Sequence, residues 1–113
     1  MPLAKAITKY VRISPRKARY AADLARGLSV ENATLQLKYC KLRGGRLILK
    51  TLDSAVANAE QLYNARRENM IVHEIRVDGG AILRRAKPRS KGSSTPVNKR
   101  TSHFTVVIST EGK

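Results

Sequence analysis

The sequence predicts an α+β domain: a three-stranded antiparallel sheet with three helices on one face and a long protruding basic β-hairpin. Three observations support this prediction. Segments with strand-like alternation cover residues 4–13, 70–78 and 101–110. Segments with helical periodicity lie between the first two strands, and a run of Lys and Arg lies between the last two. At 113 residues the chain has the length of one domain, residues 1–113.

The first strand and the first helix are predicted to follow one another directly. Over residues 4–13 the apolar positions of one face are Ile7, Val11 and Ile13. Ser14 then has the character of a helix N-cap, and Pro15 is well suited to the first helical position. The helix is expected to continue to Arg26 and to end at Gly27.

Two further helices are predicted before the second strand. Ser29 is expected to cap a short helix over residues 30–40. Gly44 and Gly45 are expected to break the helical pattern, so that the third helix runs from about residue 47 to residue 63. This third helix has the clearest amphipathic pattern of the chain, and its apolar positions are Ile48, Leu52, Ala55, Ala59 and Leu62.

The second and third strands flank the most unusual segment of the chain. The second strand, residues 70–78, is expected to place Ile71, Ile75 and Val77 on one face, and the third to place Phe104, Val106 and Ile108 on one face. Residues 80–100 between them form a basic arm, predicted as an extended β-hairpin. With two legs of roughly ten residues, the hairpin would project about 30 Å. Its cations are Arg84, Arg85, Lys87, Arg89, Lys91, Lys99 and Arg100.

The charge of the chain predicts a polyanionic partner. Twenty-three basic residues stand against eight acidic ones, which gives a net charge of +15. The arm holds no Asp or Glu, whereas a segment that only maintained solubility would mix charge signs. A nucleic acid is the expected partner, because Lys and Arg that neutralise phosphates release condensed counterions. A membrane is not expected, since the chain shows neither a signal peptide nor a long apolar run.

Two more basic clusters lie outside the arm. The first consists of Lys5, Lys9, Arg12, Arg16, Lys17 and Arg19, and three of its cations oppose the dipole of the first helix. The second consists of Lys38, Lys41, Arg43, Arg46 and Lys50, and an ordinary solvated face explains it equally well. Because basic clusters lie in several separate parts of the chain, we expect the protein to be buried within a large folded RNA. Docking of the protein in the groove of one duplex fits these clusters less well.

Catalysis is not predicted. Cys40, His73 and His103 lack the spacing of a metal site. The pair His73-Glu74 belongs to the alternating pattern of a strand, and His103 has no acidic residue nearby in sequence to orient its imidazole. No cofactor motif is present, so no cofactor or metal is expected. The alternative class is a DNA-architectural protein with a basic β-arm. Such arms usually carry an apolar wedge, whereas the tip here is Gly92-Ser93-Ser94.

Five segments carry the motifs of a known family, in the same order and over essentially the whole chain. They are residues 12–19 (RISPRKAR), 22–27 (ADLARG), 52–60 (LDSAVANAE), 88–92 (PRSKG) and 99–107 (KRTSHFTVV). On these residues the chain resembles the family of large-subunit ribosomal protein number twenty-two.

The resemblance implies a structural constituent of the large ribosomal subunit that is not an enzyme. It implies binding and organisation of large-subunit rRNA during assembly, and a hairpin that lines the polypeptide exit tunnel. The implied partners are the rRNA, neighbouring ribosomal proteins and the nascent chain, with the protein as a monomer within a cytoplasmic ribosome. Together with the basic clusters, it predicts RNA contacts by Arg12, Ser14, Arg16, Lys17, Arg19, Asn58, Arg84, Arg85, Lys87, Arg89, Lys91, Lys99 and Arg100.

Overall fold

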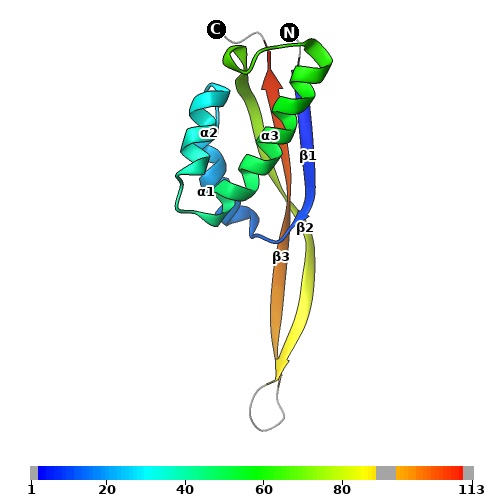
Figure 1. The fold of residues 1–113 in the computed structure, drawn as a ribbon. Helices are drawn as coiled ribbons and strands as arrows, with labels where there is room; N and C mark the ends of the chain where they lie inside the picture. Colours follow the sequence, from blue (N-terminus) through cyan, green and yellow to red (C-terminus); the bar gives the residue numbers. More distant parts are fainter. Residues whose placement is uncertain (1–2, 89–93, 111–113) are drawn as a thin grey trace.

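The computed structural model describes the backbone of residues 3–88 and 94–110, and the side chains of residues 3–80 and 100–110. The elements follow one another as β1 (Leu3–Val11), α1 (Pro15–Ala25), α2 (Val30–Lys38), α3 (Arg43–Tyr63), the short 3-10 helix η1 (Arg67–Asn69), β2 (Ile71–Pro88) and β3 (Ser94–Ser109). Figure 1 shows the helices α1, α2 and α3 beside a narrow sheet, from which β2 and β3 extend together.

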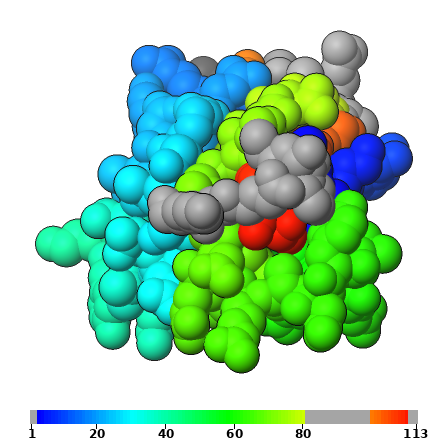
Figure 2. Space-filling model, turned by 90° about the horizontal axis from the view of Figure 1, so that it is seen from above, coloured from blue at the N-terminus to red at the C-terminus, as the bar shows by residue number. Residues whose placement is uncertain are grey.

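The sheet has the order β1-β3-β2, and β3 is antiparallel to both of its neighbours. The three helices lie on one face of this sheet (Figure 1), which confirms the predicted fold class. Viewed along the long axis, α1 and α2 (blue to cyan) lie on one side of the body and α3 (green) lies toward the other side (Figure 2). The molecule measures 63 × 25 × 15 Å, because β2 and β3 continue beyond the helices.

An irregularity in β1 changes the predicted face of the first strand. The pairing of β1 with β3 shifts between Thr8 and Val11, and Tyr10 has a φ of 59°. Ile13 is buried as expected, but Ile7 is 49% exposed and lies on the face away from the helices. The prediction that Ile7 and Ile13 share a face was therefore wrong, because a bulge shifts the alternation by one residue.

The glycine pair Gly44-Gly45 lies within α3, which begins at Arg43. The prediction of a break at these residues was wrong. A Cβ atom at Gly44 would lie 3.3 Å from the Cα of Ala18, and one at Gly45 would lie 3.0 Å from the carbonyl oxygen of Leu37. A side chain at either position would be crowded where α3 packs against α1 and the end of α2, and this close packing offsets the poor helix propensity of glycine.

The apolar stripe of α3 is buried except at its last position. Ile48, Leu52, Ala55 and Ala59 are fully buried, as predicted, whereas Leu62 is 67% exposed. The last turn of α3 lies at the edge of the sheet, where the hydroxyl of Tyr63 donates a 2.9 Å hydrogen bond to the Leu3 carbonyl. Because the sheet ends there, Leu62 has no apolar surface to cover among the described residues.

A second bulge changes the face of β2. The pairing with β3 shifts between Val72 and Glu74, so that Val72, Ile75 and Val77 are buried while Ile71 is only half-buried. The predicted set with Ile71 in place of Val72 was wrong for this reason. On β3 the predicted face is confirmed: Phe104, Val106 and Ile108 are fully buried.

Strands β2 and β3 are longer than the segments predicted from alternation. Their antiparallel register continues past a second irregularity at residues 79–82, from Ile82↔Arg100 to Pro88↔Ser94. The paired residues 82–88 and 94–100 fall within residues 80–100, the segment predicted as an extended β-hairpin. Arg89 and Lys91, and the predicted tip residues Gly92 and Ser93, lie outside the described residues.

Candidate nucleic-acid interface

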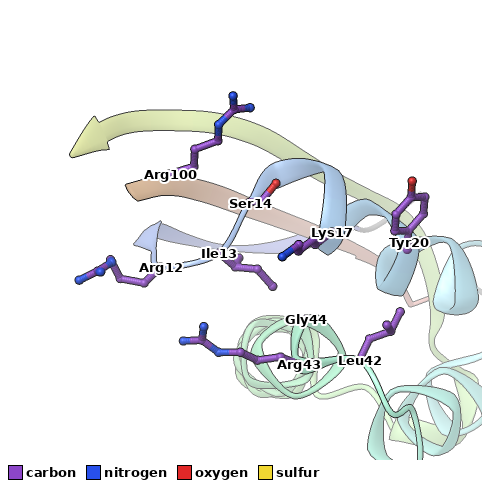
Figure 3. A pocket seen from close by; sticks show the side chains of 9 residues that line it. All are labelled: Arg12, Ile13, Ser14, Lys17, Tyr20, Leu42, Arg43, Gly44 and Arg100. Carbon is purple, nitrogen blue, oxygen red and sulfur yellow. The ribbon is translucent and has the colours of Figure 1, made fainter. Parts of the chain in front are cut away.

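A pocket of about 780 Å³ opens where the connection between β1 and α1 meets the start of α3 and the strand β3. It lies between segments that are far apart in the sequence (Figure 3). Its described lining residues are Arg12, Ile13, Ser14, Lys17, Tyr20, Leu42, Arg43, Gly44 and Arg100.

Two close contacts fix the walls of this pocket. The buried hydroxyl of Ser102, on β3, donates a 2.7 Å hydrogen bond to the Ile13 carbonyl, which ties the β1–α1 connection to the central strand. On the other side, Gly44 allows the first turn of α3 to approach the backbone of α1 at Ala18. The connection and the two helix starts are therefore held in place by packing and not by the cations themselves.

The electrostatics of the pocket are uniformly positive. Four cations line it, each from a different segment: Arg12, Lys17, Arg43 and Arg100. None of the described lining residues is acidic, and none of these four cations forms an ion pair with a described carboxylate. Each such charge remains available to an external anion.

Two helices also begin at the pocket. Helix α1 has Ser14 as its N-cap and α3 has Leu42, and neither side chain makes a capping hydrogen bond. Neither helix has an acidic residue in its first turn. Each helix start contributes a partial positive charge of about half an elementary charge and free N–H donors. The backbone thus adds to the positive potential of the side chains.

The structure brings together four of the predicted RNA-binding residues and places the other described ones elsewhere. Arg12, Ser14, Lys17 and Arg100 line the pocket. Arg16 is exposed next to it, and its Nε donates a 3.2 Å hydrogen bond to the hydroxyl of Tyr20.

Two predicted contact residues are bonded within the chain. Both Nε and Nη2 of Arg19 donate to the Val77 carbonyl, at 3.2 and 3.0 Å. The side-chain amide of Asn58 donates a 3.0 Å hydrogen bond to the Lys5 carbonyl. Both side chains attach a helix to an edge strand of the sheet. Contact of Arg19 or Asn58 with RNA stays a prediction, but each already has a structural partner.

Four cations of the arm are placed by the backbone alone. In the register of β2 and β3, Lys99 is paired with Leu83. The other three cations are paired as Arg84↔Asn98, Arg85↔Val97 and Lys87↔Thr95. These cations thus lie on paired strands beyond the body, and their role in RNA binding stays a prediction.

Five of the described lining residues were not among the predicted RNA-binding residues: Ile13, Tyr20, Leu42, Arg43 and Gly44. Arg43 was assigned to a cluster that a solvated face explained equally well, and Tyr20 was not singled out. The signal for Arg43 was hidden because Gly44-Gly45 suggested a break instead of the start of α3. Tyr20 follows Arg16 and Lys17 by four and three residues, so the three side chains occupy neighbouring positions on α1.

The residues weighed for catalysis have other surroundings. Nδ1 of His103 accepts a 3.1 Å hydrogen bond from the backbone N–H of Tyr10, and the two rings meet edge to face. Sγ of Cys40 accepts one from the backbone of Leu42 at 3.3 Å, and His73 is exposed on β2. Within residues 3–88 and 94–110, no three His, Cys, Asp or Glu side chains gather as a metal site would require. No helix in the same part of the chain is long and apolar enough to span a membrane.

An α+β fold with a cation-lined pocket fits the class of polyanion-binding proteins. Comparison with known proteins is more specific: the family described as "Ribosomal protein L22p/L17e" matches residues 6–109. The chain belongs to this family, which confirms the resemblance inferred from its motifs.

Three similar proteins share one name. "Large ribosomal subunit protein uL22" of Protochlamydia amoebophila is 63% identical over 109 residues, covering 96% of this chain and 98% of the relative. The protein of the same name from Chlamydia muridarum is 50% identical over the same shares of both chains. The protein of the same name from Chlamydia abortus is 52% identical over 92% of this chain and 94% of the relative.

Membership of this family makes the chain a ribosomal protein of the large subunit, acting in translation. It is not an enzyme, as predicted, and in bacteria its place is the cytoplasm, where ribosomes work.

Proposed function

We propose that this chain binds and organises large-subunit rRNA during assembly of the subunit, and that its arm, residues 80–100, lines the polypeptide exit tunnel. In this proposal the chain acts as a single domain, residues 1–113, and as a monomer within the ribosome. Its partners are the rRNA, neighbouring ribosomal proteins and the nascent chain.

The observation that carries the RNA-binding part is the pocket. Four cations line this one pocket although their segments are far apart in the sequence. They are Arg12, Lys17, Arg43 and Arg100. Holding four like charges together costs electrostatic free energy, which a bound polyanion would offset. Binding to phosphates would also release counterions, and the basic arm would extend the same contact beyond the body.

RNA binding is tested by the dependence of affinity on salt. The full-length protein is titrated with large-subunit rRNA at several salt concentrations, and the slope of log K against log[salt] counts the phosphates contacted. A steep slope, with retention on the large subunit in a high-salt sucrose gradient, is expected. Release to the top of the gradient, with equal affinity for duplex DNA and bending of that DNA, would support a DNA-architectural protein instead.

The tunnel-lining part is tested by cross-linking. A photo-reactive residue replaces Lys91 in the arm, and ribosomes that carry it are stalled with a radiolabelled nascent chain. Cross-links to the nascent chain are expected from this position but not from a matched replacement of Lys38, which is exposed on α2. Equal labelling from both positions, or none from Lys91, would contradict the proposed placement of the arm.

A further inference from the structure

We propose that the pocket takes one unpaired nucleotide of the RNA, with its base against Tyr20 and Leu42 and its phosphates toward Arg12 and Arg43. This inference rests on the proposed function, because it requires that the chain binds RNA. The inference also specifies the RNA element that the body of the protein recognises. This element is a bulged or looped-out nucleotide, and not the backbone of a continuous duplex.

The size and lining of the pocket support a compact ligand. Its volume of about 780 Å³ lies within the range of about 300–1,000 Å³ that is usual for small-molecule sites. Its wall is partly apolar, since Leu42, which lines it next to Ile13, is 44% exposed. A duplex backbone presents a convex row of phosphates and would leave such a hollow unfilled, whereas a base would cover its apolar wall.

A positioned aromatic ring supplies a surface for that base. Tyr20 is 54% exposed, and its hydroxyl accepts the hydrogen bond from Nε of Arg16, which restricts the orientation of the ring. Unpaired bases stack on such rings in many RNA-binding proteins. The chain has only five aromatic residues, four Tyr and one Phe. One ring at one pocket therefore fits a single nucleotide better than a run of stacked bases.

The charges give the pocket two different ends. In Figure 3, Tyr20 and Leu42 lie at one end, the guanidinium groups of Arg12 and Arg43 lie toward the other, and the ammonium group of Lys17 lies between them. A nucleotide has the same polarity, with a base at one end and a phosphate at the other. Guanidinium groups at the phosphate end can form paired hydrogen bonds with phosphate oxygens.

The test compares RNA probes that differ at one position. The probes are a short RNA duplex, the same duplex with one bulged nucleotide (each of the four bases in turn), and the same duplex with an abasic bulge. We expect the full-length protein to bind at least one base-containing bulge about five times or more tighter than the other two probes, because a stacked base contributes at least that factor. Tyr20→Ala should abolish this preference, while Tyr20→Phe, which keeps the ring, should retain it.

Tyr39→Ala is the matched control, because Tyr39 is another exposed tyrosine, at the end of α2 and outside the pocket. It should leave the preference intact. Equal affinity for the perfect and bulged duplexes would overturn the nucleotide site and leave RNA binding standing. Binding of free adenosine monophosphate as tight as that of the bulged duplex would also overturn the assignment to RNA. Failure to bind any of the RNAs at physiological salt would overturn the proposed function together with this inference.

Discussion

The guanidinium group of Arg19 donates two hydrogen bonds to one acceptor, the carbonyl oxygen of Val77, at 3.2 Å from Nε and 3.0 Å from Nη2. Val77 lies on β2, an edge strand of the sheet, and Arg26, the C-cap of α1, donates a 2.9 Å bond to the Ile75 carbonyl two residues earlier. Two arginines of α1 and its C-cap therefore donate hydrogen bonds to backbone carbonyl groups of this edge strand. A free edge would offer the same groups to another chain.

Replacing Arg19 by Ala should lower the free energy of unfolding by about 1–2 kcal/mol, because hydrogen bonds from charged donors contribute about 1.5–3 kcal/mol and this one is partly exposed to solvent. Denaturant unfolding measures the loss. Arg12→Ala, which removes an exposed arginine without a described hydrogen bond, is the control and should leave stability nearly unchanged. Equal stability of the two variants would mean that the Arg19 side chain does not hold the strand.

The opposite edge of the sheet depends on Asn58, whose amide donates to the Lys5 carbonyl on β1. Asn58→Ala should lower stability by about 1 kcal/mol, the usual net contribution of one hydrogen bond, and should increase self-association through the exposed edge. Analytical ultracentrifugation at high salt checks the second effect. Ser54→Ala, at an exposed position of the same helix, should change neither quantity. A strictly monomeric Asn58→Ala protein would speak against this edge-covering role.

Gly45→Ala should destabilise the protein although alanine is the better helix former. The new methyl group would lie 3.0 Å from both the Leu37 carbonyl oxygen and the Cβ of Cys40, neither of which can rotate away. The strain of overpacking costs about 1–3 kcal/mol, against a propensity gain of about 1 kcal/mol. Thermal unfolding measures whether the substitution lowers or raises the melting temperature. A higher melting temperature would show that α2 and α3 can move apart without loss of stability.

Leu52 and Leu62 form a matched pair on α3. Leu52 is fully buried, so Leu52→Ala should cost about 2–5 kcal/mol of stability. Leu62 is 67% exposed, and the same substitution there should change stability by less than about 0.5 kcal/mol. Denaturant unfolding of both variants decides whether the buried stripe ends before the last turn. Similar losses from the two variants would place Leu62 in the core.

Arg43→Ala should weaken RNA binding and reduce the salt slope by about 0.9 for each phosphate that the Arg43 side chain neutralises. Arg43 lines the pocket, whereas Lys38 is exposed on α2 outside it, so Lys38→Ala is the comparison. Titration of rRNA at several salt concentrations measures both slopes. If the slope falls equally for both variants, the pocket has no special share in the binding.

Predictions from the sequence succeeded where the signal was local. Ser29 accepts a hydrogen bond from the backbone of Asn32, and α2 begins directly after it, as the N-cap pattern predicted. Gly27 has a φ of 80° after the end of α1, the left-handed conformation that a helix-terminating glycine adopts. The alternation of Phe104, Val106 and Ile108 was also read correctly, because β3 is regular in that part.

Other predictions failed where the signal depended on contacts between distant segments. Bulges at Tyr10 and His73 moved Ile7 and Ile71 out of the core, and neither bulge has a local cause in the pattern of apolar residues. The glycine pair at the start of α3 suggests a turn when it is considered alone. Only the packing of α3 against Ala18 and Leu37 explains why these residues are helical glycines.

The sequence by itself determined the fold class, the order of the elements and the strongly basic character of the chain, because local periodicity, helix capping and net charge depend only on neighbouring residues and composition. Tertiary structure alone decided which cations lie together. Arg12, Lys17, Arg43 and Arg100 meet at one pocket because Ser102 anchors the β1–α1 connection and Gly44 brings α3 against α1. It also decided that Arg19 and Asn58 face carbonyl groups of the sheet edges, since a side chain's partner depends on which backbone folding places within its reach.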